Sequence, residues 1–251
     1  MMQQWLWAAL SVAVLSPGPA IVWNNVTLGA PVSTLRPLAG DPLRIVKAPD
    51  GMARIGRYWL PGLSSTAFLI VEKRGYIQAF SATTKDVSAG GFESVPPDPS
   101  GVRLGDELES VKKLHPEFHA EAAEDGSPQL VGEVADPAAG VVYEFQDGRV
   151  RSFQWGMLDV SGPELPGLVD PAGDSTATAI LNLQRTASQG SNWETLYLGY
   201  HRCDERVRWN VVRQSVVREN GHVYDRLHVA CASTRDVRDF YFDVSSYAAK
   251  S

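Results

Sequence analysis

Two segments rich in proline and glycine interrupt this sequence and limit how far any helix or strand can run. The first, 83–100, contains paired glycines and three prolines, and the second, 161–173, contains three more prolines. Proline lacks a backbone N–H and fits neither the interior of a helix nor the middle of a sheet. The two segments are therefore predicted to be linkers. They separate three segments that are expected to fold, at 21–82, 101–160 and 174–251.

The N-terminus has the pattern of a secretion signal. Trp5–Leu15 is an apolar run of 11 residues, and the Pro-rich stretch after it ends in Gly18-Pro19-Ala20. The run has the length of a signal-peptide core and is too short for a membrane span, which takes roughly 20 apolar residues. Residues 1–20 are therefore predicted to be a signal peptide, which makes the protein periplasmic or secreted. Because no Lys or Arg precedes the run, an uncleaved N-terminal anchor and a cytoplasmic location remain alternatives.

The acidic charge is concentrated in the middle of the chain. The formal net charge is −6, but residues 101–170 alone contain 14 Asp and Glu against 5 Lys and Arg. Nucleic acid requires a basic surface, so this distribution argues against a nucleic-acid partner. It permits a basic protein partner, and the alternative is an acidic face that contacts only water.

A short pattern occurs twice in the first two folding segments. Val26-x-Leu28-Gly29 recurs as Val102-x-Leu104-Gly105, and Gly75-Tyr76-Ile77-x-x-Phe80 recurs as Gly148-Arg149-Val150-x-x-Phe153. The first pattern precedes apolar residues at helical spacing, and the second lies in alternating segments typical of a hairpin. Each segment is therefore predicted to be one copy of a repeated unit, a helix followed by antiparallel strands.

The second copy resembles a known family. Gly101–Leu114 (GVRLGDELESVKKL) combines a glycine-flanked aliphatic pair with a short amphipathic helix, and Val142–Val150 (VYEFQDGRV) is a strand that ends in an Asp-Gly turn. This arrangement resembles the β-lactamase-inhibitor-protein fold, which the small lipoprotein of the outer-membrane barrel-assembly machinery shares. The resemblance covers residues 24–82 and 100–156, and the lipid-attachment Cys is missing. It implies helices packed on a small antiparallel sheet, in tandem, and a role in binding another protein.

The third segment, 174–251, is predicted to be a separate α+β unit. A helix is expected from Asp174 or Ser175 to about Ser188, because a capping residue precedes apolar residues at helical spacing. Asn220-Gly221 predicts a hairpin turn. Strands are expected at 193–203, 207–217, 222–232 and 237–244. The fold class predicted for the whole chain is therefore α+β, with two repeated helix-plus-antiparallel-sheet units followed by an α-β-β-β-β meander unit.

Cys203 and Cys231 are the two cysteines of the chain. In an exported protein such a pair predicts a disulfide, which would stabilise the fold by roughly 3–4 kcal/mol in the chain-entropy description. His201 and His228 lie close to them in sequence, so a zinc site and a Cys–His nucleophile are alternatives. Strand parity weighs against zinc, because His201 and Cys203 would share one face of a strand whereas His228 and Cys231 would not.

No sequence motif indicates a catalytic, cofactor or metal site, since the nucleophile-elbow, zinc-protease, phosphate-loop and dinucleotide patterns are all missing. Arg57, Tyr58 and Trp59 form the best small patch for a protein contact, because these residue types are frequent at interface hot spots. The alternative is that they belong to the core. The expected function is non-catalytic protein binding in the cell envelope, as an inhibitor, immunity factor or assembly accessory, with no transmembrane span after signal removal. The alternative is an envelope hydrolase whose site the sequence does not reveal.

Overall fold

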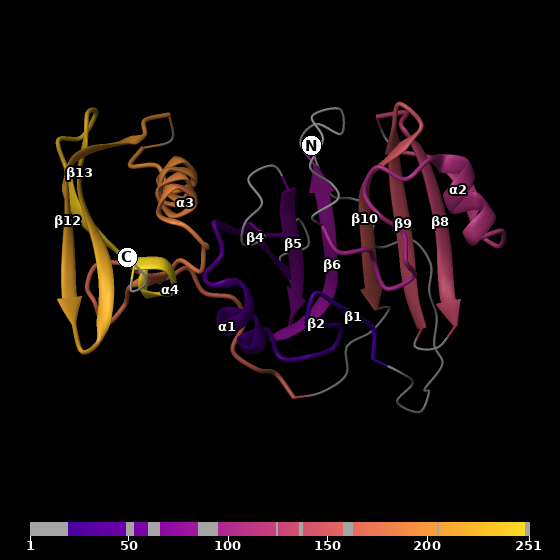
Figure 1. Ribbon diagram of the computed structural model, residues 1–251, viewed down its shortest axis with the longest axis horizontal. Coiled ribbons are helices and arrows are strands. Elements are labelled where there is room, and N and C mark those ends of the chain that lie inside the picture. The colour runs from indigo at the N-terminus through magenta and orange to yellow at the C-terminus, as the bar shows by residue number, and fades with distance from the viewer. Residues whose placement is uncertain are drawn as a thin grey trace. The chain divides into compact units, whose positions relative to one another are not determined.

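The structure, a computed structural model, describes residues 20–48, 53–59, 66–84, 95–123, 125–135, 138–157, 163–204 and 206–248. All but the last residue of the predicted signal peptide therefore lies outside the described residues. The chain forms two compact units. The first comprises residues 1–34, 46–56 and 65–168, and the second comprises residues 35–45, 57–64 and 169–251. Most of the regular structure is β-strand (Figure 1).

The largest element is an eight-stranded antiparallel sheet in the order β3-β4-β5-β6-β10-β9-β8-β7. A small hairpin of β1 (Val22–Trp23) and β2 (Val26–Thr27) precedes it in the chain. The bounds of the eight strands are β3 Arg44–Lys47, β4 Ala53–Trp59, β5 Thr66–Lys73, β6 Tyr76–Thr84, β7 His119–Ala122, β8 Pro128–Ala135, β9 Ala138–Gln146 and β10 Arg149–Met157.

The predicted α+β class with two repeated helix-plus-sheet units is wrong, because strands from 21–82 and from 101–160 belong to one sheet. β6 pairs with β10 in an antiparallel register that places Phe80 opposite Trp155. The helical portions are also short. A 3-10 turn η1 (Val32–Leu35) leads into α1 (Arg36–Ala39), and α2 is Leu108–Leu114. A local pattern does not reveal this pairing, since the two strands are distant in sequence.

The two glycine patterns form the same local connection. Gly29 and Gly105 have φ angles of 78° and 88°, a region in which glycine has no steric penalty. The N–H of Gly29 donates to the carbonyl of Ile77, and the N–H of Gly105 donates to the carbonyl of Val150, both at 2.8 Å. In each case the chain that precedes a helical segment is therefore hydrogen-bonded to a central strand of the sheet. That strand is β6 for Gly29 and β10 for Gly105.

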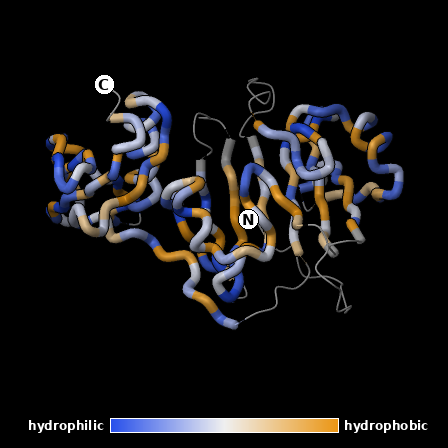
Figure 2. Tube along the Cα trace, turned by 60° about the horizontal axis from the view of Figure 1, so that its bottom comes forward, coloured by the Kyte–Doolittle hydropathy of each residue, from blue (hydrophilic) through white to orange (hydrophobic). Residues whose placement is uncertain are grey.

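Aromatic residues form the core of the first unit. The ring of Trp23 lies 5.1 Å from Phe68, 5.6 Å from Phe80 and 5.3 Å from Phe153, measured between ring centroids. All four side chains are buried. Figure 2 shows hydrophobic residues along the strands in the middle of the picture. The small hairpin thus contributes a large side chain that covers one face of β5, β6 and β10.

The second unit contains a four-stranded sheet in the order β11-β14-β13-β12, in which β11 is parallel to β14 and the other pairs are antiparallel. Asn220 and Gly221 have positive φ angles of 50° and 80° at the β12–β13 turn. The hairpin expected there is therefore present. The elements are β11 Ile180–Leu181, α3 Ala187–Tyr200, β12 Trp209–Glu219, β13 His222–Cys231, β14 Val237–Asp243 and α4 Ser245–Ala248.

Two elements expected in the third segment are wrong. No helix runs from Asp174 to Ser188, and the expected strand 193–203 is mostly helix α3. Thr186 caps α3, because its side chain accepts a hydrogen bond from the N–H of Gln189. A Thr three residues before a Gln is the pattern of a capping box. Trp193, Tyr197 and Leu198 have helical spacing and are buried.

Helix α3 covers one face of the four-stranded sheet. The ring of Trp193 lies 6.2 Å from Phe242, and the ring of Tyr197 lies 6.3 Å from Phe240. Gly190 allows α4 to approach, because a Cβ on Gly190 would lie 2.1 Å from the hydroxyl of Tyr247. The core of this unit therefore lies between α3, α4 and the strands β13 and β14.

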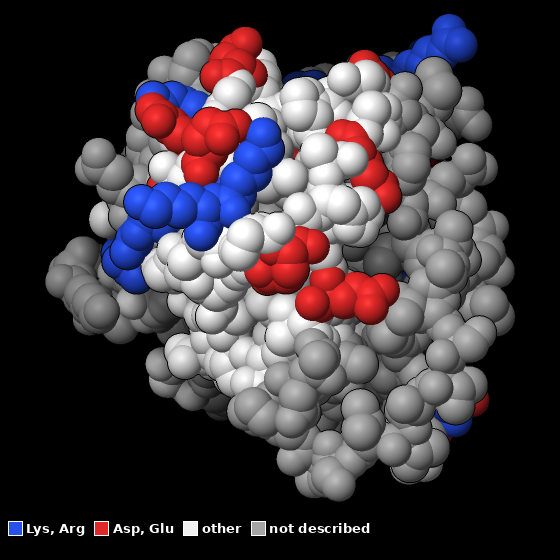
Figure 3. Space-filling view, turned by 90° about the vertical axis from the view of Figure 1, so that its right-hand side faces the viewer, with Lys and Arg blue, Asp and Glu red and all other residues white. Residues whose placement is uncertain are grey.

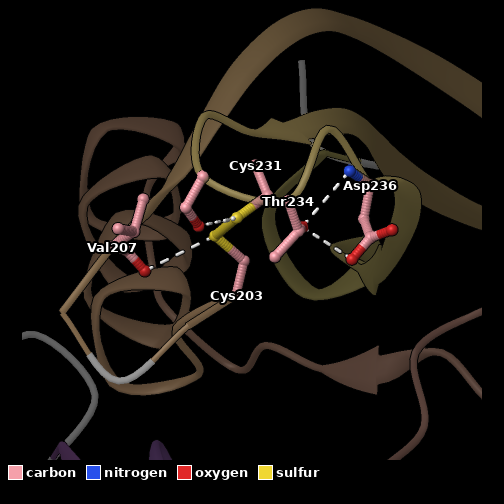
Figure 4. Close-up of a disulfide and its surroundings, with 6 residues drawn as sticks. Cys203, Val207, Cys231, Thr234 and Asp236 are labelled. Atoms are coloured by element: carbon pink, nitrogen blue, oxygen red, sulfur yellow. Dashed lines mark hydrogen bonds between the residues drawn. A yellow bond between two sulfur atoms is a disulfide. The ribbon is translucent and has the colours of Figure 1, made fainter.

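The predicted disulfide between Cys203 and Cys231 is confirmed (Figure 4). The two Cα atoms are 5.8 Å apart. Cys203 lies just after α3 and Cys231 is the last residue of β13, so the bond joins the helix to the sheet rather than two strands. The turn after β13 is closed by the N–H of Cys231, which donates to the carbonyl of Asp236 at 2.8 Å.

Candidate functional site

Strand β12 forms an open edge of the four-stranded sheet. It contains 11 residues and pairs with β13 along its whole length. In the part of the chain that the structure describes, no strand pairs with its other side. An open edge presents unpaired backbone N–H and C=O groups to which another strand can bind. Natural proteins usually shorten such an edge, cover it or place charges along it.

Apolar side chains remain exposed along this edge. The exposed fractions of Val211, Val212 and Val216 are 51%, 64% and 59%. At the start of β12, Trp209 reaches the core with its ring 6.0 Å from Phe240, but the valines beyond it stay in solvent. A long strand with exposed β-branched residues on an open edge is typical of a surface that receives a further strand.

The register with β13 assigns the side chains of β12 to two faces. Val211 is opposite Val229, and Val216 is opposite Asp225. Val229 is buried, and Val229 and Asp225 share one face of β13 because alternate residues of a strand point to the same side. Val211 and Val216 therefore lie on the face of the sheet that packs against α3. Arg213 is opposite His228 on the other face. The register shifts between Val211 and Arg213, which makes Val212 an extra, bulged residue.

The face that carries Arg213 is basic. Asp239 on β14 already binds two basic side chains, since Arg226 Nη2 lies 2.5 Å and His228 Nδ1 lies 2.8 Å from its carboxylate oxygens. The hydrogen bond from Arg226, with that of His228, lowers the pKa of Asp239. Among the described residues no carboxylate forms an ion pair with Arg213. This arginine is therefore open to an acidic partner.

The patch expected at Arg57, Tyr58 and Trp59 is only partly placed. All three residues lie in β4, and the Trp59 side chain lies outside the described part of the chain. Tyr58 is 2% exposed, so it belongs to the core, and burial raises its pKa. The guanidinium of Arg57 lies 6.0 Å from the ring centroid of Tyr200. Tyr58 cannot serve as a surface anchor, and a partner contact at Arg57 stays a prediction.

The two histidines near the cysteines have separate surroundings. The ring of His201 stacks on Tyr197 at 4.0 Å, and its Nε2 donates to the carbonyl of Leu43 at 3.0 Å. Burial lowers the pKa of His201. His228 binds Asp239 on the sheet surface. Because both sulfurs are in the disulfide, neither can act as a thiolate ligand of zinc or as a nucleophile.

A densely bonded polar cluster is centred on Asp98, which the sequence did not indicate. Asp98 is 4% exposed. Its Oδ1 accepts from the backbone N–H groups of Ser100 and Val102, and its Oδ2 accepts from Tyr143 at 2.5 Å and from Trp155 at 2.9 Å. Burial, and then the charge of Asp98, raise the pKa of Tyr143. The carboxylate therefore joins the loop after residue 95 to β9 and β10.

A serine, a histidine and a glutamate adjoin this cluster in the order found in some hydrolases. Ser100 Oγ lies 3.0 Å from His115 Nε2, and His115 Nδ1 lies 3.3 Å from Glu117 Oε1. However, Ser100 Oγ donates its proton to Asp98 at 2.8 Å. His115 Nε2 must then donate to Ser100, which is the reverse of what a general base does.

The backbone around Ser100 also lacks free donors for an oxyanion. The N–H groups of Ser100 and Val102 are bound by the Asp98 side chain, and the N–H of Gly101 donates to the Asp98 carbonyl at 3.0 Å. An oxyanion hole needs such donors aimed at the reacting oxygen. The cluster therefore has the chemistry of a structural network and does not favour a hydrolase.

The acidic charge of residues 101–170 is partly paired within its own surface. Glu109 binds Lys112 at 2.8 Å, and Glu107 binds Arg149 at 3.0 Å. Figure 3, which views the first unit from the side of α2 and β8, shows acidic groups beside a band of basic ones. Exposed pairs of this kind contribute little to stability. A basic partner for this face stays a prediction.

Comparisons with known proteins give no family. No family model matches the chain, and no curated protein matches it. Among solved structures, the chain is similar to an extracellular protein containing a SCP domain from Bacillus anthracis str. Ames, with a TM-score of 0.38 and 13% identity. The match covers 55% of this chain and 50% of that one, so the chain spans about half the length of that protein. Likeness at this level carries no argument, and the resemblance to the β-lactamase-inhibitor-protein family stays a prediction.

Two findings bear on compartment. The chain contains the Cys203–Cys231 disulfide, and disulfides persist in oxidising surroundings. None of the helices within the described residues combines the length and the apolar character needed to cross a bilayer.

Proposed function

We propose that this chain is an exported, non-catalytic protein that binds another protein by accepting an extended segment along the open edge of β12. The observation that carries the proposal is the exposure of Val211, Val212 and Val216 on a strand of 11 residues that, within the described residues, pairs on one side only. Strand addition of this type uses main-chain hydrogen bonds for affinity and alternate side chains for specificity. An inhibitor, an immunity factor and an assembly accessory can all act in this way.

Export is supported by the disulfide and by the apolar run at Trp5–Leu15. Signal cleavage after Ala20 would leave Ile21 as the first residue. Ile21 is 7% exposed, and its carbonyl accepts from the N–H of Leu28 at 3.0 Å, so a chain that begins there keeps the β1–β2 hairpin. N-terminal sequencing of exported protein is expected to begin near Ile21. An intact Met1 on most of the protein in a fraction free of membranes would contradict export.

The binding proposal is tested by capture from an envelope extract with three forms of the mature protein. The edge variant is the double substitution Val212→Lys and Val216→Lys, which places charges on the open side of β12. The control is Val237→Lys, because Val237 is 64% exposed but lies on β14, which β13 separates from β12. Substitutions at such exposed positions usually change stability by less than about 0.5 kcal/mol.

We expect to capture a partner protein with the wild type and with the Val237→Lys control. The edge variant should not capture it. Hydrogen exchange on the complex should then show slower exchange for the outward amides of β12. A partner that all three forms retain equally, with unchanged exchange in β12, would mean that another surface binds it and would overturn the proposal.

A further inference from the structure

The two faces of β12 make different demands on an added strand. Side chains of neighbouring strands meet on the same face, and those of one strand alternate between faces. On the face toward α3, an added strand would meet Val211 and Val216. On the opposite face it would meet Arg213, with His228 directly beyond on β13.

The valine face favours apolar residues on the incoming strand. Val211 and Val216 are 51% and 59% exposed, so an apolar neighbour would remove most of their remaining surface from water. A charged residue at the same place would be partly desolvated by the two valine side chains without gaining a polar partner. The residues of the incoming strand that face Val211 and Val216 should therefore be apolar.

The arginine face favours acidic residues. Among the described residues Arg213 has no carboxylate partner, and the nearest acid on this face, Asp239, is already bound by Arg226 and His228. Arg218 does not belong to this face, because it lies opposite Val223, so Arg213 is the arginine of β12 that an acidic residue here would meet. Opposite charges across neighbouring strands are favourable, and like charges are unfavourable.

We infer that the partner of β12 is an extended protein segment in which acidic residues alternate with apolar residues. The acidic residues face Arg213, and the apolar residues face Val211 and Val216. This inference rests on the proposed strand addition and specifies the chemistry of the segment that is added.

The test uses synthetic peptides of about nine residues, a usual length for a strand. One alternates Asp with Val, a second has the same composition with all Val residues before all Asp residues, and two more replace Asp in the alternating peptide by Ser or by Lys. Binding to the mature protein is measured by fluorescence anisotropy. The variant is Arg213→Glu, and the matched control is Arg185→Glu, an exposed arginine outside β12.

The alternating Asp–Val peptide is expected to bind most tightly. Its affinity should fall about three- to tenfold in Arg213→Glu, because an exposed charge contact becomes a repulsion, and should not change in Arg185→Glu. Added salt should weaken it for the same reason. The Lys–Val peptide should bind more tightly to Arg213→Glu than to the wild type.

Each contrary result has a separate meaning. If the Ser–Val or the block peptide binds as tightly as the Asp–Val peptide, and the Val212→Lys/Val216→Lys protein loses both, strand addition stands and the acidic or alternating pattern is wrong. If the free protein dimerises and the edge variant does not, a second copy occupies the edge and the inference is wrong. If no peptide binds and a captured partner is retained by the edge variant, the proposed function fails together with the inference.

Discussion

Glu194 on α3 is a buried acid whose ionisation should set how the second unit responds to pH. It is 2% exposed. Its Oε1 accepts from Tyr247 at 3.3 Å and from Asn182 at 3.5 Å, and among the described residues no basic side chain contributes to its electrostatic surroundings. Burial, and then the charge of Asp225, raise its pKa from the ordinary 4.5 to about 8. We predict that Glu194→Gln removes a pH-dependent loss of stability.

The sign follows from where the proton binds. Below about pH 4.5 the carboxyl is protonated in both the folded and the unfolded chain, and its contribution to stability is fully present. Between pH 4.5 and about 8 the unfolded chain has released the proton that the folded chain retains, so the free energy of unfolding falls as pH rises. The shift corresponds to at most on the order of 5 kcal/mol.

Urea denaturation, followed by tryptophan fluorescence at about pH 5, 7 and 9, measures this effect. Gln has the shape of the neutral acid, so the variant should match the wild type at the lowest pH and exceed it by several kcal/mol at the highest. Glu219→Gln, at an exposed position of the same unit, is the control and should not change the pH dependence. An equal difference between Glu194→Gln and wild type at all three pH values would refute the reasoning.

Two further perturbations test the packing. Replacing Cys203 and Cys231 by Ser should lower the free energy of unfolding by about 3–4 kcal/mol, measured by urea denaturation, while leaving peptide binding at β12 unchanged. A loss of stability below about 1 kcal/mol would show that removing the disulfide adds little conformational entropy to the unfolded chain. Gly132→Ala should destabilise the first unit by about 1–3 kcal/mol, because its Cβ would lie 2.0 Å from the Phe118 ring. Gly140→Ala on the neighbouring strand, where a Cβ meets nothing within 4 Å, should have a much smaller effect in the same assay.

Features that depend on a few adjacent residues could be predicted from the sequence. The turn at Asn220-Gly221 requires two positive φ angles, which these residue types tolerate, and the structure has them. The disulfide was predictable because the chain has two cysteines and an N-terminal pattern typical of an export signal. Both conclusions follow from local chemistry, so distant parts of the fold do not alter them.

Helix α3 shows where local interpretation failed. Trp193, Tyr197 and Leu198 are buried on one side of a helix, but aromatic and β-branched residues around them favoured a strand. The capping box at Thr186 and Gln189 was the signal that could have identified the helix.

The open edge and the joined sheet could not be predicted. Whether β12 is an edge depends on the order β11-β14-β13-β12, which is set by the parallel pairing of β11 with β14. The alternation of β12 looks the same in an inner and an outer strand. The joined sheet likewise depends on the contact of β6 with β10, whose residues are distant in sequence.

The pairing of β6 with β10 has a consequence for any attempt to divide this protein. Each of these strands contains nine residues, and they are the place where the β3–β6 and β7–β10 parts of the sheet meet. Cleavage of the chain between β6 and α2 would leave two complementary fragments, each with the natural partner strand of the other. The fragments should stay together when made together. Either fragment made alone would expose the unpaired edge of β6 or of β10, which could pair with a strand of another chain.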